Sequence, residues 1–397
     1  MQITFFSNFL NHHQLPFCLE MTKYQENQFT FVETEPIEQE RLDMGYEDMG
    51  EKYSFALKSY KNDECYTRAL KAGIESDVVI IGSAPEIFIQ ERLRENKVTF
   101  RYTERILKEG LIRVLDPRVS YGIWNQNTRH KKKNMYLLCA SAYTAYDMNL
   151  FRAYPGKKYK WGYFPEVKEH DIEQLMLNKK KNKKISILWA GRFLKWKHPE
   201  VAVKVAEGLK KAGYQFKLTF IGDGEVKSDL VSYVQQNQLQ DVVEFKGFMS
   251  PDKVRNYMEE ADIFLFTSDF NEGWGAVLNE SMNSGCAVVA SHAIGSVPFL
   301  IKHGMNGFIY KNGDIKELIS LVMRLCDDDN LRENLGKQAY RTLAEVWNAK
   351  NAAASFLQLS QAILNGERIE ITNGPCSIAE VVSQRKMYNY LIKNGET

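Results

Sequence analysis

Six short apolar runs alternate with helical patterns in the C-terminal half of the chain, and this alternation most constrains the fold. One helical pattern places Val201, Val205 and Leu209 on a single apolar stripe. Strands that alternate with helices of this length predict a parallel, doubly wound α/β sheet. Ligands of such sheets bind at the carboxyl ends of the strands. The six runs are residues 185–190, 216–221, 242–247, 262–267, 286–291 and 307–310.

The N-terminal half repeats this pattern less regularly. A chain of 397 residues suits two domains of ordinary size. We predict an N-terminal Rossmann-like domain over 1–164, a polar linker over 165–184 and a C-terminal Rossmann-like domain over 185–345. Asp116-Pro117 is expected to end a helix over 104–115. The other predicted elements of this half are strands at 3–7, 29–33, 77–82, 98–102, 135–140 and 159–163, and helices near Gln14 and over 61–75, 85–95 and 141–152.

The composition is that of an ordinary globular protein, with 44% apolar and 26% charged residues. The net charge of +2 argues against a nucleic-acid partner. No run of 18 apolar residues predicts a transmembrane helix, and the N-terminus reads as a strand rather than a signal peptide. The six cysteines are scattered without metal-ligand spacing. We therefore expect a cytoplasmic protein with free thiols.

Two carboxylates, Glu272 and Glu280, stand eight positions apart and flank Gly273 and Gly275. The glycines let the backbone approach a ligand, and the helix that follows presents free N–H groups to it. Carboxylates repel phosphate, so their natural partners are hydroxyl groups. A ligand with hydroxyls at both ends and phosphates between them fits this pattern, which predicts a nucleotide sugar.

Arg192 and Lys197 follow the first strand of the C-terminal half. A guanidinium binds two phosphate oxygens at once, and an ammonium group acts as a mobile point charge beside it. A diphosphate leaving group gains negative charge as the glycosidic bond breaks, so cations fixed there stabilise the transition state. We interpret the pair as a diphosphate clamp.

Four segments together resemble the retaining glycosyltransferases of family 4, which have the GT-B fold. They are the Glu-x7-Glu segment, WAGRFLKWKHPE (189–200), FIGDGE (220–225) and VEFKGFMS (243–250). The resemblance is strong over 185–309. It implies an α/β GT-B enzyme with two Rossmann-like domains that face each other across an interdomain cleft. It also implies that residues 346–397 form a C-terminal helix and tail that cross back onto the N-terminal domain.

The resemblance further implies a role for each motif residue. Glu272 would bind hydroxyls of the transferred sugar, and Glu280 would accept both ribose hydroxyls. The donor would be a UDP-sugar or GDP-sugar, with no metal or other cofactor, because Asp327-Asp328-Asp329 reads as a turn and helix cap. The implied catalytic residues are Arg192, Lys197 and Glu272, and the implied donor-binding residues are Glu280, Gly273, Trp274, Gly275, Ala276, Gly222, Asp223, Gly224 and Phe248. Two alternatives stay open, a plain turn for 222–224 and core packing for Phe248.

The N-terminal half lacks the Gly-Gly loop of many relatives. In its place Asn11, His12 and His13 follow the first strand, and Glu104 and Arg105 follow a later one. We expect these five residues to contact the donor or the acceptor. Ordinary loop polarity and a capped, solvated helix start are the alternatives.

These features predict retaining transfer of a sugar from a nucleotide diphosphate to a carbohydrate or lipid-linked carbohydrate. Bacterial surface polysaccharide or glycolipid synthesis is the expected setting. A GT-B nucleotide-sugar epimerase or hydrolase that needs no acceptor is the alternative, and a binding protein without activity also stays open. A Rossmann dehydrogenase is disfavoured, because Leu278 stands where its third glycine would be.

A basic helix over 104–115, followed by Trp124 and the run 129–133, predicts peripheral contact with an anionic membrane. The protein would then lie at the inner face of the membrane. The alternative is an amphipathic helix packed on the sheet, with its basic groups in water.

Overall fold

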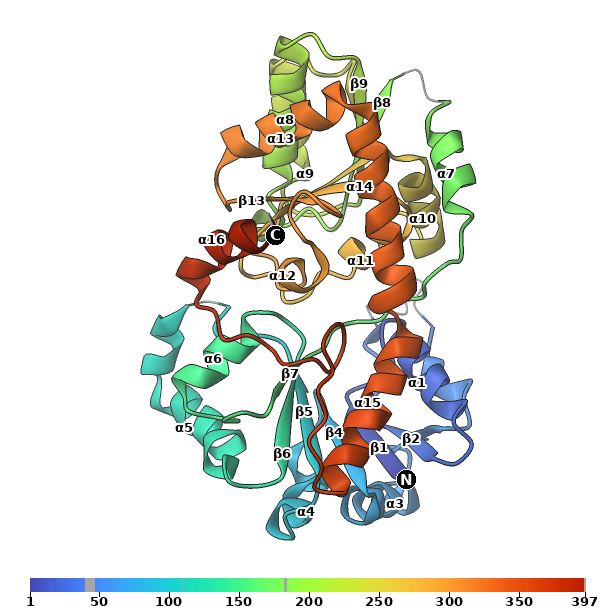
Figure 1. Cartoon of the computed structure of the whole chain (residues 1–397), viewed down its shortest axis with the longest axis vertical. Helices are drawn as coiled ribbons and strands as arrows, with labels where there is room; N and C mark the ends of the chain where they lie inside the picture. Colours follow the sequence, from blue (N-terminus) through green and yellow to red (C-terminus); the bar gives the residue numbers. More distant parts are fainter. Residues whose placement is uncertain (40–46, 109, 182–183, 396–397) are drawn as a thin grey trace. The chain divides into compact units, whose positions relative to one another are not determined.

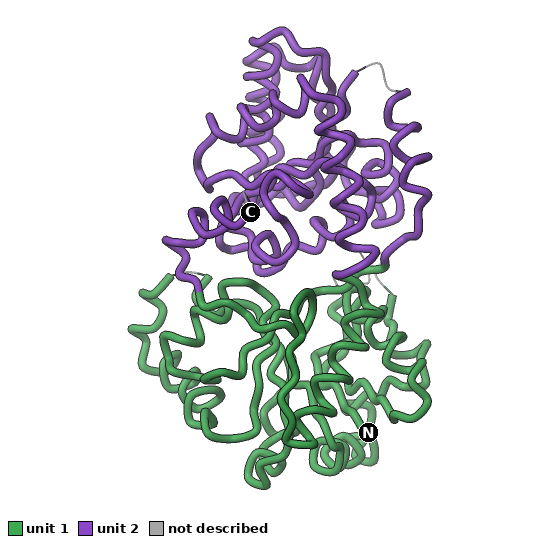
Figure 2. The backbone as a smooth tube through the Cα atoms, viewed as in Figure 1, with its two compact units in different colours: residues 1–166, 347–381 green, residues 167–346, 382–397 purple. Residues whose placement is uncertain are grey.

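The computed structural model describes residues 1–39, 47–108, 110–181 and 184–395. The chain divides into two compact units (Figure 2). Unit 1 comprises residues 1–166 and 347–381, and unit 2 comprises residues 167–346 and 382–397. The chain therefore passes between the units three times.

In the described part of unit 1, seven strands form a parallel sheet in the order β3-β2-β1-β4-β5-β6-β7 (Figure 1). The strand order reverses between β1 and β4, which makes their carboxyl ends the ligand-binding edge of such a sheet. The strands are β1 (Gln2–Ser7), β2 (Gln28–Glu33), β3 (Ala56–Lys58), β4 (Val78–Ile81), β5 (Thr99–Thr103), β6 (Met135–Cys139) and β7 (Lys158–Lys160). The helices are α1 (Leu15–Thr22), α3 (Asp63–Glu75), α4 (Gln90–Arg94), α5 (Pro117–Gln126), α6 (Thr144–Leu150) and α15 (Ala349–Leu364), with 3₁₀ turns η1 (Met49–Glu51), η2 (Glu86–Phe88), η3 (Leu111–Leu115) and η4 (Thr128–His130).

The segment that returns to unit 1 completes its core and covers one sheet edge. Phe356 of α15 is buried against the rings of Phe17 and Trp161, at centroid distances of 6.2 and 6.0 Å. Beyond α15, the Lys160 amide of β7 donates to the Ser377 carbonyl at 2.7 Å. An antiparallel bridge joins Tyr159 to Ile378. The returning backbone thus satisfies groups that an open edge strand would expose.

In the described part of unit 2, six strands form a second parallel sheet in the order β10-β9-β8-β11-β12-β13. Ile187 pairs with Leu218 on one side and with Ile263 on the other, and all three are buried. The strands are β8 (Ile185–Ala190), β9 (Phe216–Ile221), β10 (Val243–Phe245), β11 (Ile263–Phe266), β12 (Ala287–Ser291) and β13 (Phe308–Tyr310). The helices are α7 (Ile172–Lys179), α8 (Pro199–Lys211), α9 (Lys227–Gln236), α10 (Pro251–Glu260), α11 (Val277–Asn283), α12 (Val297–Leu300), α13 (Ile315–Asp327), α14 (Asp329–Arg341) and α16 (Gln384–Gly395), with a 3₁₀ turn η5 (Lys195–Lys197) and a π-helical turn η6 (Thr342–Val346).

Each apolar run predicted in the C-terminal half contains one of these strands. The predicted helical stripe is also confirmed, because Val205 and Leu209 of α8 are fully buried and Val201 is partly buried in the same core. Helix α8 begins with Pro199 in its first turn, where a proline costs no hydrogen bond. The two sheets and their helices confirm the predicted pair of Rossmann-like folds.

The predicted helix over 104–115 is wrong. Asp147 accepts hydrogen bonds from the Arg105 side chain and from the Leu107 amide at 3.1 Å, which holds residues 105–107 as a loop. Gly110 has φ 85°, outside the helical region. Asp116 ends the 3₁₀ turn η3, which occupies the last part of the predicted segment, and it also begins α5, since its side chain caps that helix by accepting from the Arg118 amide at 2.9 Å.

The predicted linker over 165–184 contains a helix of unit 2. Helix α7 buries Met176 and Lys179. The Lys179 ammonium group donates to the carbonyls of Met258, at 3.0 Å, and Ala261. These internal bonds make α7 part of the domain, although its lysine-rich end resembles a solvated linker.

The predicted tail also needs correction, because its last helix belongs to unit 2. Met387 and Leu391 of α16 are buried, and the Tyr388 hydroxyl bonds the Glu317 carboxylate at the start of α13. The Tyr388 ring meets His292 edge-on at 5.5 Å. Only residues 347–381 of the predicted tail pack with unit 1.

Candidate active site

The predicted clamp and the predicted sugar-binding glutamate follow neighbouring strands of unit 2. Arg192 and Lys197 follow β8, and Glu272 follows β11. These strands pair at the point where the strand order reverses. The carboxyl ends of such strands form the usual ligand-binding crevice of a doubly wound sheet.

The four motifs come together at this edge, because β10, β9, β8 and β11 are consecutive in the sheet. The Gly191 amide donates to the Ile221 carbonyl at 3.0 Å, and the Gly222 amide donates to the Gly247 carbonyl at 2.8 Å. Only a glycine fits at 222, where φ is 132° and a Cβ atom would lie 1.9 Å from the Gly191 oxygen. The Gly-Asp-Gly turn thus brings two loops of the site into contact.

Lys197 and Glu272 form an ion pair within the site. The Lys197 Nζ lies 2.6 Å from the Glu272 Oε2, and their side chains are only 13% and 10% exposed. The Ser268 hydroxyl donates to the same oxygen at 2.9 Å. Within the described ranges, no group is hydrogen-bonded to Oε1 of Glu272, so this oxygen is available to a ligand hydroxyl.

The loop after β11 is fixed to the loop after β8 by further bonds. The Thr267 hydroxyl donates to the Lys197 carbonyl at 2.7 Å, and the Asp269 amide donates to the Trp196 carbonyl at 3.0 Å. His198 lies within 3.3 Å of Asp269 and 2.7 Å of Glu200, and hydrogen bonds to these carboxylates raise its pKa to about 9. His198 is therefore cationic at neutral pH and ties the two loops electrostatically.

Sequence reasoning missed Thr267, Ser268 and His198. The only signal was that these polar side chains lie in the loops after β8 and β11, and this signal is weak because loops are commonly polar.

Arg192 is the exposed member of the predicted clamp. Among residues 1–39, 47–108, 110–181 and 184–395, no side chain is paired with its guanidinium. A free guanidinium and a partly buried lysine in the same loop after β8 suit a ligand with two anionic oxygens.

The Glu272-Gly-Trp-Gly segment makes a tight turn before α11. Gly275 has φ 81°, and a Cβ atom there would lie 2.4 Å from the Phe266 ring, so the turn requires glycine. The Trp274 side chain is only 1% exposed, and its indole N–H donates to Asn279 at 2.9 Å. This corrects one expectation, since the Trp274 side chain belongs to the core and only its backbone remains a candidate for donor binding. Gly273 and Ala276 complete the turn, and Ala276 precedes the first residue of α11.

Glu280 lies in the first turn of α11 and is half-buried. Burial raises the pKa of its carboxyl group to about 7, and the positive charge of Arg255 opposes this rise only in part. No hydrogen bond from another described residue reaches the carboxylate. A half-buried carboxylate without an internal partner is suited to accept hydroxyl groups from a ligand.

The remaining donor-side candidates are exposed. Phe248 is 62% exposed, which excludes core packing as the explanation for this residue. The Asp223 carboxylate pairs with Lys227 at 2.6 Å and caps the Gly224 amide at 2.8 Å. Gly224 itself has φ 150° and packs against the Phe193 backbone. These bonds favour a turn role for Asp223, and a role for Phe248 in base binding stays a prediction.

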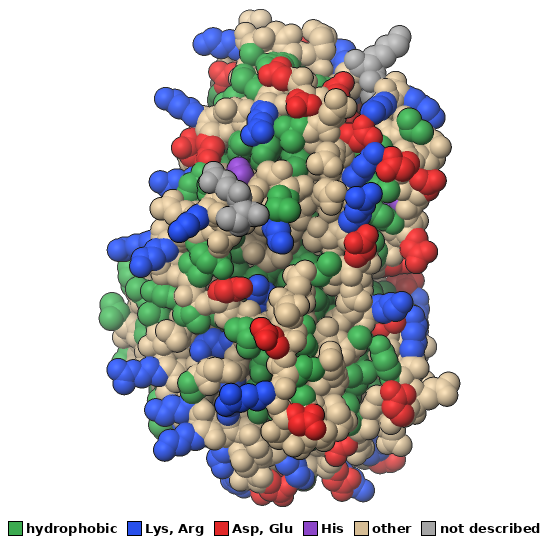
Figure 3. All heavy atoms as spheres, viewed as in Figure 1, with side chains coloured by type: hydrophobic (Ala, Val, Ile, Leu, Met, Phe, Trp, Pro, Cys, Tyr) green, Lys and Arg blue, Asp and Glu red, His purple; other side chains and the backbone are tan. Residues whose placement is uncertain are grey.

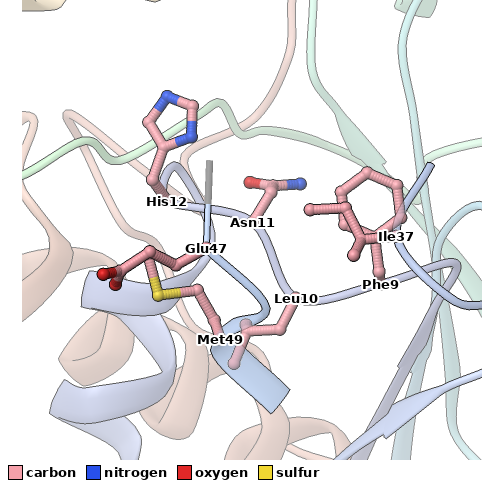
Figure 4. A pocket seen from close by; sticks show the side chains of 7 residues that line it. All are labelled: Phe9, Leu10, Asn11, His12, Ile37, Glu47 and Met49. Carbon is pink, nitrogen blue, oxygen red and sulfur yellow. The ribbon is translucent and has the colours of Figure 1, made fainter. Parts of the chain in front are cut away.

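Three of the N-terminal candidates lie at the carboxyl end of β1 in unit 1. Asn11 accepts from the amides of His13 and Gln14, at 3.0 and 3.1 Å, and so shapes the loop before α1. Asn11 and His12 also line a cavity of about 20 Å³, room for about one water molecule (Figure 4). The other side chains around this cavity are Phe9, Leu10, Ile37, Glu47 and Met49.

His13 and Glu104 are joined through a tyrosine that the sequence did not single out. The His13 ring stacks on Tyr163 at 5.5 Å, and the Tyr163 hydroxyl donates to Glu104 at 2.6 Å. Arg105 requires correction, because it is 5% exposed and pairs with the buried Asp147 at 3.3 Å. Its role in this structure is to anchor a loop rather than to contact a ligand.

The described residues contain no group of three or more histidine, cysteine or acidic side chains that could hold a metal ion. Asp328 caps α14 by accepting from the Leu331 amide at 2.9 Å, and Asp327 accepts from the Tyr214 hydroxyl at 2.8 Å. The acidic triplet is therefore a turn and helix cap. No helix in the described ranges combines the length and apolar character needed to span a membrane.

Comparisons with known proteins identify proteins that this chain resembles. Residues 171–342 match the family model described as glycosyl transferases group 1. The amylovoran biosynthesis glycosyltransferase AmsK of Erwinia amylovora is 33% identical over 146 residues, 36% of each chain. The putative colanic acid biosynthesis glycosyltransferase WcaL of Salmonella typhimurium is 27% identical over 186 residues, 45% of each chain. The chain thus matches less than half the length of these relatives.

Solved structures share the fold over most of the chain. Alr3699/HepE of Anabaena in complex with UDP has a TM-score of 0.64 at 15% identity, over 92% of this chain and 99% of that chain. Sucrose-phosphate synthase of Thermosynechococcus elongatus has a TM-score of 0.62 at 15% identity, over 92% and 100%. Together these matches confirm the predicted resemblance to GT-B glycosyltransferases. The residues that match the group 1 model all lie in unit 2, and membership of family 4 stays a prediction.

Proposed function

We propose that this chain transfers a sugar from a UDP-sugar or GDP-sugar to a carbohydrate or lipid-linked carbohydrate, with retention at the anomeric carbon. The proposal depends chiefly on the Lys197–Glu272 pair at the strand-order reversal of the domain that matches the group 1 model. Arg192 is in the same loop after β8 as Lys197. The pair puts a cation for phosphate next to an acceptor for sugar hydroxyls.

Each residue has a chemical task in this proposal. Arg192 and Lys197 bind the diphosphate and stabilise the charge that it gains as the glycosidic bond breaks. Glu272 accepts sugar hydroxyls through Oε1, while its other oxygen orients Lys197. Glu280 accepts the ribose hydroxyls, and backbone N–H groups of residues 273–276 face the sugar and the phosphate nearest to it. Phe248 is exposed at the end of β10, where it can stack on the base.

The acceptor is proposed to be a carbohydrate of a surface polysaccharide or glycolipid. Two relatives are named for amylovoran and colanic acid synthesis, which supports this class. In unit 1, His12, His13 and Glu104 lie near the carboxyl ends of β1 and β5 and offer polar groups for it.

A donor panel tests the proposal. We expect one nucleoside diphosphate to be released from its sugar conjugate faster when the correct acceptor is added. Proton NMR of the product should show the same anomeric configuration as in the donor. An inverted product would contradict retention, and rapid donor consumption without any acceptor would favour the epimerase or hydrolase alternative.

Metal dependence gives a second test. We expect activity to survive chelation with EDTA, because protein cations supply the positive charge at the diphosphate. A complete loss of activity in EDTA that is restored by Mg²⁺ would contradict the assignment.

Arg192→Ala should lower kcat/KM by about 10²-fold or more, since one charged transition-state contact is worth about 2.7–4 kcal/mol. Its melting temperature should stay unchanged because Arg192 is exposed.

A further inference from the structure

An exposed apolar surface lies on unit 1, over η3 and α5. Ile112 and Leu115 of η3 are 79% and 80% exposed, and Leu111 beside them is also exposed. Tyr121 and Trp124 of α5 are exposed too, with ring centroids 6.0 Å apart. Monomeric proteins rarely leave such side chains together in water without a binding role.

The two elements form one continuous surface. Asp116 both ends η3 and caps α5, and the Ser120 hydroxyl of α5 donates to the Val114 carbonyl of η3. Hydrophobic side chains gather on the side of unit 1 where α5 lies, with basic side chains around them (Figure 3). The η3–α5 face is defined here as Leu111, Ile112, Leu115, Tyr121 and Trp124, together with Lys131 and Lys132.

The charge of this face is strongly positive. Residues 110–133 contain six basic residues and one acidic residue, Asp116, which pairs with Arg118 at 3.0 Å. Lys131 and Lys132 are exposed, and no described residue pairs with either ammonium group. The Arg129 guanidinium donates hydrogen bonds to Asn125 and to His130. Neither partner cancels its charge, because Asn125 is an amide and burial lowers the His130 pKa to about 4.

The second basic run, residues 179–184, behaves differently. Lys179 is buried and donates to backbone carbonyls, Lys180 pairs with Glu333 at 2.6 Å, and Lys181 bonds Asn178 at 2.8 Å. These lysines serve unit 2 itself, while residues 182–183 lie outside the described part of the chain. Both segments contain a dense basic run, so this run alone does not set the η3–α5 face apart from residues 179–184. The η3–α5 face differs because its lysines are unpaired among the described residues and accompany exposed apolar residues.

We propose that the η3–α5 face docks on an anionic lipid bilayer. Leu111, Ile112 and Leu115 enter the boundary between headgroups and acyl chains, and Tyr121 and Trp124 lie at headgroup level, where such rings are favoured. Lys131 and Lys132 attract anionic headgroups. Helix α5 has ten residues and spans about 15 Å, and Lys131 and Lys132 follow it after the turn η4. The apolar and basic groups are therefore close enough along the chain for one flat bilayer to contact both.

A bilayer fits this face better than a second copy of the chain. A symmetric dimer would place the same surface against itself. The basic residues of the two η3–α5 faces would then repel each other, because like charges across an interface disfavour association. The proposal is independent of transferase activity. It keeps the membrane partner, Trp124 and the basic run 129–133 expected from the sequence, and it replaces the predicted helix over 104–115 with the shorter turn η3.

Vesicle sedimentation of the full chain tests this docking. We expect the protein to sediment with vesicles of phosphatidylcholine and phosphatidylglycerol at low salt, and not with phosphatidylcholine alone. High salt should release it, because screening shortens electrostatic attraction to about 10 Å at 0.1 M. Lys131→Ser/Lys132→Ser should lower the partition coefficient about 25-fold, since each lysine near an anionic surface contributes about fivefold. Ile112→Ser/Leu115→Ser should lower it at least tenfold.

A matched control comes from α7 of unit 2. Leu177 is exposed and Lys181 lies near it in sequence, so Leu177→Ser/Lys181→Ser removes the same kinds of group elsewhere. This variant should sediment like the unmodified protein, and all three variants should keep its melting temperature. Equal sedimentation of all variants would overturn the proposal. So would a dimer in analytical ultracentrifugation that Ile112→Ser/Leu115→Ser abolishes while no variant binds vesicles.

Discussion

Lys197→Met is expected to lower kcat about 10²- to 10³-fold and to lower the melting temperature as well. The loss of rate follows if Lys197 stabilises the departing diphosphate, because one such contact is worth about 2.7–4 kcal/mol. The loss of stability follows from the ion pair, since Glu272 would keep a largely buried charge with only the Ser268 hydroxyl as partner. Breaking a buried pair from one side costs about 3–5 kcal/mol, and slight exposure here reduces this to about 2–4 kcal/mol.

A double substitution separates the two effects. Adding Glu272→Gln to Lys197→Met removes the stranded charge, so thermal denaturation should recover most of the lost stability while kcat stays low. Lys195→Met is the matched control, because Lys195 is an exposed lysine of the same short turn, η5. The Lys195→Met variant should change neither kcat nor the melting temperature strongly. If the double variant regained activity together with stability, Lys197 would be a structural residue and the diphosphate role would be wrong.

The architecture was predictable because most strands are apolar runs of ordinary length. The exceptions have physical causes. Strand β3 has only three residues, all partly exposed, so its short segment carries no clear periodic signal. The segment 104–115 has helical spacing of apolar residues, but its Arg105 side chain and Leu107 amide donate to Asp147, which is distant in sequence, and these bonds hold its first part as a loop. The spacing of apolar residues within a segment cannot reveal a contact with a residue that is distant in sequence.

The site was predictable only as a set of strand ends. The motifs around Arg192, Gly222, Phe248 and Glu272 were each assigned to the end of a strand, and the structure places those strands side by side. The direct bond between Lys197 and Glu272 could not be derived, because it depends on the pairing of β8 with β11 rather than with a strand next in sequence. The inward direction of Trp274 was hidden as well, since an aromatic residue between two glycines fits both a binding loop and a core.

Glu280→Gln is expected to stabilise the ligand-free protein at pH 8 and to leave its stability unchanged near pH 4. Burial raises the carboxyl pKa from 4.5 to about 7, so the folded state keeps a proton that the unfolded state releases. Native stability therefore falls as pH rises from about 4.5 to 7, and the loss is complete above that range. A neutral amide of the same shape removes this loss, which is on the order of 1–3 kcal/mol. Melting temperatures of both proteins between pH 4 and pH 8 measure this difference in stability.

The same substitution should weaken donor binding, because stability and function oppose each other at Glu280. If the carboxylate accepts both ribose hydroxyls, Glu280→Gln should cost about 1.5–3 kcal/mol of donor affinity at pH 8. Donor affinity of the unmodified protein should rise as pH increases through 7, where the carboxyl group ionises, while the variant should show no such rise. Calorimetry should use an intact nucleotide sugar, since a terminal phosphate titrates near pH 6 by itself. Equal affinity of both proteins at pH 8 would remove Glu280 from the ribose site, even if its effect on melting were confirmed.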